Sequence, residues 1–168
     1  METTIYIRKA THEDIPALMS LFECAKEIMR ASGNLHQWGS GYPSVNVLRQ
    51  DIEQGVCYVA TDALNGEIEA TMAFIPGPDP TYSYIEGGAW LDDNPYHVIH
   101  RIAVAKPGKG YARQLLDWAF EHTGTVRIDT HRDNVIMHHI LRKYGFEYCG
   151  VIYLVNGDAR DAYLLSRC

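Results

Sequence analysis

A glycine-rich turn with basic side chains stands near the middle of the chain and has the composition of an anion-binding site. Residues 106–110 read KPGKG, and Arg113 follows three positions later. The half-apolar run of residues 99–104 before the turn, rich in β-branched side chains, predicts a strand. The apolar spacing after the turn, from Tyr111, predicts a helix with one buried face. The first N–H groups of that helix, its dipole and the nearby positive charges favour a bound phosphate. The alternative is an ordinary strand–helix connection in which the glycines only permit a tight turn.

A second segment, residues 129–146, again leads from a strand through a polar turn into a helix. The predicted strand at residues 126–130 contains Asp129, and Asn134 stands in the turn before a predicted helix. Gly145 follows that helix and precedes an apolar residue, which is typical of a helix C-cap. In this order and at this separation, the two segments resemble the GNAT superfamily of N-acetyltransferases.

The resemblance covers nearly the whole chain and implies both the fold and the co-substrate, acetyl-CoA. It implies a single domain over residues 1–168 with a GNAT-like acyl-CoA N-acyltransferase fold. In that family the segment similar to residues 108–112 wraps the pyrophosphate with backbone amides. The strand similar to residues 102–104 binds the pantetheine arm, and an asparagine contacts the pantetheine or positions the chemistry. The matching residues of this chain, which form the implied cofactor-binding set, are Ile102, Ala103, Val104, Gly108, Lys109, Gly110, Tyr111, Ala112, Arg113 and Asn134.

The chain departs from the family pattern at two places. Pro107 precedes Gly108, where the family usually has arginine or glutamine, and the approach to the turn is shorter than usual. Many members also carry a tyrosine as general acid four residues before the glycine that ends the second helix, and the matching residue here is Leu141. Tyr144, three positions further on, is a substitute candidate for this acid, and an aromatic cap on the core is the alternative role for it.

Acetyl transfer to an amine requires a group that removes a proton from the amine. Asp129 is the first candidate for this base because it ends the strand that faces the cofactor strand; its alternative role is a turn or helix cap. Glu86 is expected either to face the acceptor from a preceding strand or to be a surface charge. His100 is expected to share a strand face with Ile102 and Val104, where a histidine more often packs than reacts.

The segment of residues 35–45 has no periodicity and combines aromatic residues with glycines and a proline. Aromatic side chains on a loop are costly to expose unless they cover something. Trp38 and Tyr42 are therefore expected either to cap the core or to form a wall of the substrate pocket.

The remaining pattern predicts an α/β (α+β) domain with a mixed, mainly antiparallel central sheet flanked by helices. Helices are expected from residue 11 to about 31, at 47–54, from 111 and at 134–143. Strands are expected at 4–8, 56–60, 67–75, 99–104, 126–130, 148–155 and 161–166. Residues 81–86 are expected to form a further strand or an extended segment.

The bulk composition excludes several classes of function. The net charge of -6 argues against a nucleic-acid-binding surface. No apolar run approaches the roughly 20 residues of a membrane span, and the N-terminus is too polar for a signal peptide. No metal is expected, since the pairs His97/His100 and His138/His139 do not converge. The cysteines lack metal and redox spacing, so reduced thiols and a cytoplasmic location are expected; they are Cys24, Cys57, Cys149 and Cys168.

The expected function is transfer of an acetyl group from acetyl-CoA to a primary amine, most simply that of a small molecule, because the chain has no extra domain to hold a large partner. Direct attack in a ternary complex requires no metal and no covalent intermediate. A protein N-terminus or lysine as acceptor is one alternative. A non-catalytic acyl-CoA-binding sensor is the other, favoured by Leu141 at the position of the usual tyrosine. The sequence leaves open whether the chain forms a homodimer.

Overall fold

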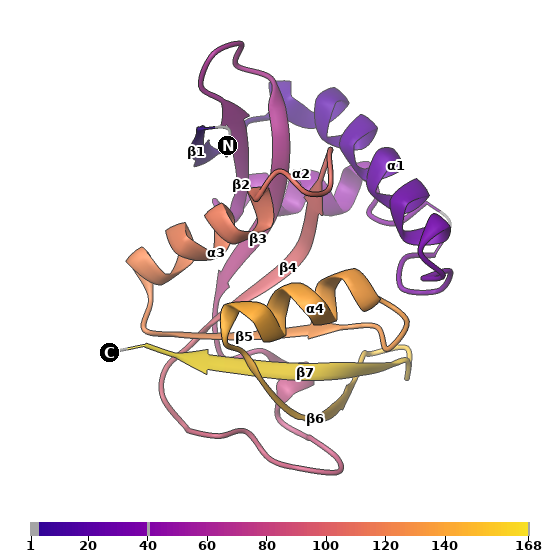
Figure 1. Cartoon of the computed structure of the whole chain (residues 1–168), viewed down its shortest axis with the longest axis vertical. Helices are drawn as coiled ribbons and strands as arrows, with labels where there is room; N and C mark the ends of the chain where they lie inside the picture. The colour runs from indigo at the N-terminus through magenta and orange to yellow at the C-terminus, as the bar shows by residue number, and fades with distance from the viewer. Residues whose placement is uncertain (1–3, 40, 168) are drawn as a thin grey trace.

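The structure, a computed structural model, describes residues 4–39 and 41–167, so Cys168 lies outside the described residues. A seven-stranded sheet with the order β1-β2-β3-β4-β5-β7-β6 forms its centre (Figure 1). The strands are β1 (Ile5–Lys9), β2 (Cys57–Asp62), β3 (Ile68–Pro76), β4 (His97–Val104), β5 (Thr125–Thr130), β6 (Glu147–Tyr153) and β7 (Ala159–Ser166). The helices are α1 (Ile15–Ala31), α2 (Val45–Glu53), α3 (Tyr111–His122) and α4 (Val135–Tyr144), and the 3-10 turns are η1 (His12–Asp14) and η2 (Pro80–Tyr82).

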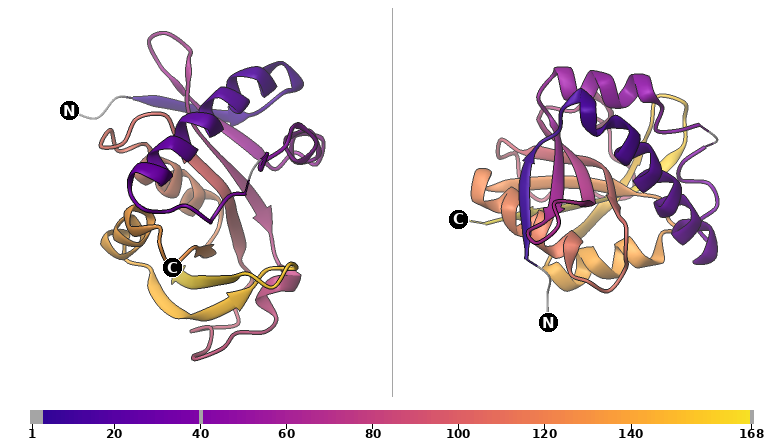
Figure 2. Two further views of the ribbon diagram at one scale, coloured as in Figure 1. Left: turned by 90° about the vertical axis from the view of Figure 1, so that its right-hand side faces the viewer. Right: turned by 90° about the horizontal axis from the view of Figure 1, so that it is seen from above.

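Strands β4 and β5 run parallel, and every other adjacent pair in the sheet is antiparallel. The expected mixed, mainly antiparallel sheet flanked by helices is therefore confirmed. Helices α1 and α2 cover one face and α3 and α4 cover the other (Figure 2). Leu18 and Leu48 belong to the core on the α1 face, and Leu115 and Leu141 belong to the core on the α3 face. Burial of these apolar side chains supplies the main driving force that holds the layers together.

The segment at residues 81–86, expected to be a strand or an extended segment, forms no named strand and begins in a 3-10 turn. Pro80 begins the 3-10 turn η2 instead, and the Asp79 side chain accepts a hydrogen bond from the N–H of Thr81. Glu86 pairs through its backbone with Val151 in an isolated bridge. The proline and the aspartate cap favour a turn over an extended chain, because proline fixes φ and removes a donor.

Helix α2 begins two residues earlier than expected, and β6 ends two residues earlier. Ser44 is the N-cap of α2, and its hydroxyl accepts a hydrogen bond from the N–H of Val47. The serine therefore sets the start of this helix at Val45, ahead of the apolar spacing that the sequence shows from Val47.

Strand β4 contains an irregularity that overturns the expected shared face of His100, Ile102 and Val104. Arg101 has a φ of 52°, and the pairing with β3 shifts register at this point. Ile102 and Val104 pack with the α3-face core, whereas the His100 ring lies against Tyr82, 6.2 Å between centroids. The extra residue interrupts the alternation of side chains, so even-numbered residues before and after the bulge point to opposite faces of the sheet.

No helix among the described residues is long and apolar enough to span a bilayer. No group of three or more histidine, cysteine, aspartate or glutamate side chains within residues 4–39 and 41–167 is placed to hold a metal ion.

Candidate active site

Strands β4 and β5 separate near the middle of the sheet. Their pairing begins at His97 and Val126 and ends at Ile99 and Ile128, and Arg101 follows two residues after Ile99. Figure 1 shows β4 rising away from β5 beyond this point. The parting of the two strands opens the sheet between its two helical layers.

Arg101 holds the irregular part of β4 in place. Its Nε and Nη2 atoms donate to the two carboxylate oxygens of Asp51 on α2, over 2.8 and 2.9 Å, and its Nη1 donates to the hydroxyl of Tyr42 over 3.1 Å. A left-handed backbone costs a non-glycine residue about 1–2 kcal/mol. Because the guanidinium fork matches the buried carboxylate, this ion pair offsets the backbone cost and fixes the bulge.

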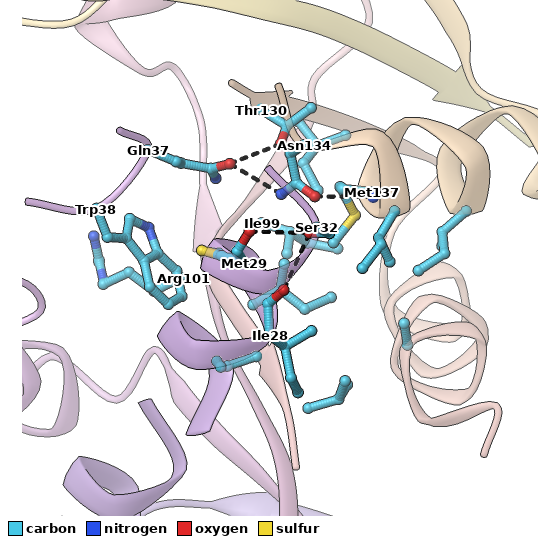
Figure 3. Close-up of a pocket in the computed structure, with 18 of the residues that line it drawn as sticks. Ile28, Met29, Ser32, Gln37, Trp38, Ile99, Arg101, Thr130, Asn134 and Met137 are labelled. Carbon is cyan, nitrogen blue, oxygen red and sulfur yellow. Dashed lines mark hydrogen bonds between the residues drawn. The ribbon is translucent and has the colours of Figure 1, made fainter. Parts of the chain in front are cut away.

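A cavity that is partly open to solvent occupies the gap between the two strands (Figure 3). Its walls come from both faces of the sheet, since α1 and α4 both contribute. The residues of β4 and β5 that line it are Ile99, Arg101, Ile102, Ala103, Val104, Ile128, Asp129 and Thr130. The lining residues from outside these strands include Ile28, Met29, Trp38, Ala112, Asn134, Met137 and Ile140.

The glycine turn lies at one edge of this cavity, because Val104 and Ala112 on either side of the turn both line it. Gly108 and Gly110 have φ angles of 79° and 78°, a conformation that glycine adopts at little cost. Gly110 is the N-cap of α3 and has no side chain with which to cap the helix. The start of α3 thus keeps the open, positively polarised character that suits a phosphate.

The basic residues of the turn lie on the surface, and their contacts are modest. Lys106 lies 3.7 Å from the Glu69 carboxylate with 60% of its side chain exposed, and Lys109 is exposed. Arg113 donates to Asp117, one helical turn further along α3, over 2.7 Å. The pair of Arg113 and Asp117 lies on the surface, where ion pairs are weak, and Lys106 keeps most of its side chain exposed, so these cations remain able to face an anionic ligand.

The structure places Ile102, Ala103, Val104, Ala112 and Asn134 of the expected cofactor-binding set in the cavity wall. Asn134 also caps α4, since its Oδ1 accepts from the N–H of Met137 over 3.1 Å.

The expected substrate residues separate into two groups. Trp38 lines the cavity, and the Tyr42 ring packs edge-on against the Trp38 ring, with centroids 6.4 Å apart. Glu86 is exposed, and its carboxylate accepts a hydrogen bond from the hydroxyl of Tyr153, the last residue of β6. Because Glu86 lies outside the lining of the cavity, its predicted place facing the acceptor is not supported.

The two expected catalytic residues also separate. Asp129 lines the cavity and accepts a hydrogen bond from the hydroxyl of Tyr82 over 2.6 Å. Tyr144 lies at the end of α4, where its hydroxyl donates to Asp117 over 2.7 Å. Burial and the Asp117 carboxylate raise the pKa of Tyr144 to about 12. The cavity meets the first half of α4, so Tyr144 lies beyond it, and its position argues against the acid role.

Gln37 lines the cavity and was not singled out from the sequence, whereas His100, which was expected to pack, lies beside the cavity residue Asp129. Gln37 reaches across from the loop before α2, and its Oε1 accepts from Asn134 Nδ2 over 2.9 Å and from Thr130 Oγ1 over 3.2 Å (Figure 3). His100 lies with Nε2 2.9 Å from the carboxylate of Asp79. Neither pairing has a local signal, because each joins residues far apart in the chain.

The pKa of Asp79 reflects this pairing. Burial alone would raise it, but hydrogen bonds from His100 and from Thr81 outweigh burial and lower the pKa to about 2. Asp79 is therefore an ionised acceptor at neutral pH.

A seven-stranded sheet that opens between β4 and β5, with a glycine turn at the opening, defines an acetyltransferase, and comparison with known proteins agrees. The sequence profile described as the acetyltransferase (GNAT) family matches residues 16–146. A GNAT-family acetyltransferase from Streptococcus agalactiae is 33% identical, with a TM-score of 0.85 over 98% of this chain and 96% of that chain. The chain belongs to the GNAT family of acetyltransferases.

More distant solved structures share the fold alone. A GNAT-family acetyltransferase from Listeria monocytogenes is 20% identical, with a TM-score of 0.70 over 96% of this chain and 94% of that chain. The PaiA N-acetyltransferase from Thermoplasma acidophilum, solved in complex with coenzyme A, is 14% identical, with a TM-score of 0.67 over 97% and 99%. No curated protein sequence gives a significant match.

Proposed function

We propose that this acetyltransferase transfers the acetyl group of acetyl-CoA to the primary amine of a small molecule, by direct attack while both substrates are bound. The observation that carries the proposal is the cavity lined from both faces of the sheet, with the glycine turn at one edge and Asp129 in its wall. Two substrates that enter from opposite faces of the sheet can meet where β4 and β5 part.

The residues on the α3 face fit an acyl-CoA. The open start of α3 at Gly110 suits a pyrophosphate, and Gly108 has room around it, since a Cβ there would meet nothing within 4 Å. Ile102, Val104 and Ile140 offer an apolar wall for an aliphatic arm. Bound acetyl-CoA would supply an acetyl group already activated as a thioester.

The part of β4 that has left β5 can serve the chemistry through its backbone. Within the described residues, the stretch from Arg101 to Val104 has no pairing with β5. A backbone N–H on this edge can donate to the carbonyl oxygen that gains charge during the transfer. Holding the amine and the acyl group together contributes a further large part of the rate enhancement.

The acceptor side of the cavity favours a small amine over a protein chain. The bridge from Gln37 to Thr130 and Asn134 spans the cavity between the loop and α4, and Trp38 and Met29 add bulk beside it. This closure confines the acceptor, which supports a small molecule.

The test is acetyl transfer to a panel of monoamines, diamines, amino-acid amides, N-terminal peptides and lysine peptides, followed by thiol release and product mass. We expect at least one small amine to be acetylated with a higher kcat/KM than any peptide. Transfer to peptides alone would overturn the small-molecule acceptor. CoA binding without an acetylated product on any acceptor would overturn the proposed transfer itself and leave the sensor alternative.

A further inference from the structure

Four polar side chains form a connected cluster on the α1 side of the gap between β4 and β5. Tyr82, which is fully buried, donates to Asp129 Oδ2 over 2.6 Å. The His100 ring lies between two carboxylates, with Nε2 2.9 Å from Asp79 and Nδ1 3.8 Å from Asp129 Oδ2. The cluster thus joins the loop after β3, strand β4 and strand β5, and Asp129 is its member in the cavity wall.

Asp79 determines which nitrogen of His100 carries the proton in the neutral ring. An ionised carboxylate can only accept a hydrogen bond, so Nε2 must be the donor at 2.9 Å. The neutral ring therefore leaves a lone pair on Nδ1. Asp79 is itself fixed, because its other oxygen accepts from both the N–H and the hydroxyl of Thr81.

The Nδ1 atom of His100 keeps its acceptor capacity unused. At 3.8 Å, Asp129 is too far for a hydrogen bond, and its Oδ2 is already occupied by Tyr82. In the described part of the chain, Nδ1 has no hydrogen-bond partner. The His100 side chain is 23% exposed and lies next to Asp129, which lines the cavity, so a small ligand held at Asp129 comes within reach of the ring.

The charges around His100 favour a cation beside it. Asp79 and Asp129 face the ring, and Tyr82 lies edge-on to it. The neighbouring Arg101 turns away to Asp51 on α2, and Arg127 stacks over the rings of Trp90 and Tyr96. The two charged groups that contact the ring are therefore both negative, which suits an ammonium group.

We propose that His100 Nδ1 takes the proton from the acceptor amine, that Asp79 positions the ring for this role, and that Asp129 binds the amine in its ammonium form. The acceptor class is then a cationic primary amine. This inference rests on the proposed function and deepens it.

The step balances as follows. The ammonium group gives one proton to Nδ1, and its nitrogen then bonds to the acetyl carbon as the carbon–sulfur bond breaks. The second proton goes to the departing thiolate, so the products are the amide and CoA thiol. His100 returns its proton to solvent, which restores the neutral ring.

The experiment uses His100→Gln and Asp79→Asn, with His12→Gln and Asp93→Asn as matched controls at exposed positions. The acceptor is the panel amine with the highest wild-type rate. For His100→Gln we expect kcat/KM to fall about 10²–10⁴-fold and the acid limb of the pH–rate profile to disappear. For Asp79→Asn we expect a smaller loss of kcat/KM and a neutral His100 ring whose proton is no longer held on Nε2 alone, because the ring loses the carboxylate that selects this tautomer. CoA affinity, measured by calorimetry, should stay within about twofold of wild type in all four variants.

The remaining arms separate the possible failures. Nitrogen-15 NMR of the neutral wild-type ring should show the proton on Nε2; a proton on Nδ1 would overturn the assignment. An active wild type with an unchanged profile in His100→Gln would overturn the inference and leave the proposed function intact. A wild type that binds CoA and acetylates no amine would overturn both. Thermal unfolding verifies that the variants fold. If His100→Gln does not fold, Asp79→Asn carries the test.

Discussion

The side-chain amide of Asn134 lies 2.9 Å from Oε1 of Gln37 and ties helix α4 to the loop before α2. The other end of the same Asn134 side chain caps α4 through the N–H of Met137. One asparagine thus sets the start of a helix and holds a loop over the cavity. The position that the family resemblance marks for the cofactor is, in this chain, also a structural joint between two walls of the site.

Replacing Gln37 with alanine should loosen this joint. We expect the free energy of unfolding to fall by about 1–3 kcal/mol, because the buried Asn134 amide loses a partner. We also expect the KM for the amine to rise more than the KM for acetyl-CoA. Urea unfolding and steady-state kinetics measure the two effects. Gln50→Ala, at an exposed position on α2, is the control. An unchanged amine KM would show that the bridge does not shape the acceptor side.

Replacing Gly110 with valine should abolish CoA binding. The β-branched side chain resists a φ of 78° and adds bulk at the start of α3. Gly66→Val is a matched control, because Gly66 has a φ of 74° in the turn between β2 and β3, away from the cavity. Calorimetry with CoA should show binding in the control only. Equal affinity in both variants would contradict the placement of the pyrophosphate.

Removing Arg101 should destabilise the protein strongly. Arg101→Met leaves the Asp51 carboxylate, of which 9% of the side chain is exposed, without its partner, at a cost of about 3–5 kcal/mol. The double variant with Asp51→Asn should recover part of this loss. Urea unfolding of the four proteins gives the coupling free energy. Additive effects would mean that the ion pair does not hold the bulge of β4.

Asp79 should make the free energy of unfolding depend on pH in the acid range. Its pKa falls from an ordinary value of 3.8 to about 2 in the folded protein. A depressed pKa contributes stability above about pH 4 that is lost as the pH falls towards 2. Asp79→Asn should therefore flatten the change of the urea midpoint across this window. Part of the slope should remain, because hydrogen bonding to Arg8 also lowers the pKa of Asp14. An identical slope in wild type and variant would contradict the pairing with His100.

Tyr144→Phe should leave acetyl transfer within about twofold of wild type. The hydroxyl binds Asp117 and Arg167 at the end of α4 and does not reach the cavity, so its loss should lower stability by about 1 kcal/mol and nothing more. The pH–rate profile with the preferred amine provides the measurement. A loss of basic-limb activity would return Tyr144 to the role of acid.

The sequence alone determined the features that depend on neighbours in the chain. Apolar spacing and the glycine turn located α3 and most of the sheet, and Gly145 marked the end of α4, because local backbone preferences and one-sided burial act over a few residues. The resemblance carried by residues 102–112 and 129–146 then pointed to an acetyl-CoA acyltransferase, and the chain belongs to that family.

Only the tertiary structure decided which polar groups meet at the cavity. Asp79 and His100 are 21 residues apart, and Gln37 and Asn134 are 97 apart, so no periodicity links them. The bulge at Arg101 is held by Asp51 of helix α2. Because of the bulge, His100 lies on the opposite face of β4 from Ile102 and Val104. A sequence pattern records the preference of each segment, whereas hydrogen bonds between distant side chains exist only once the segments have packed.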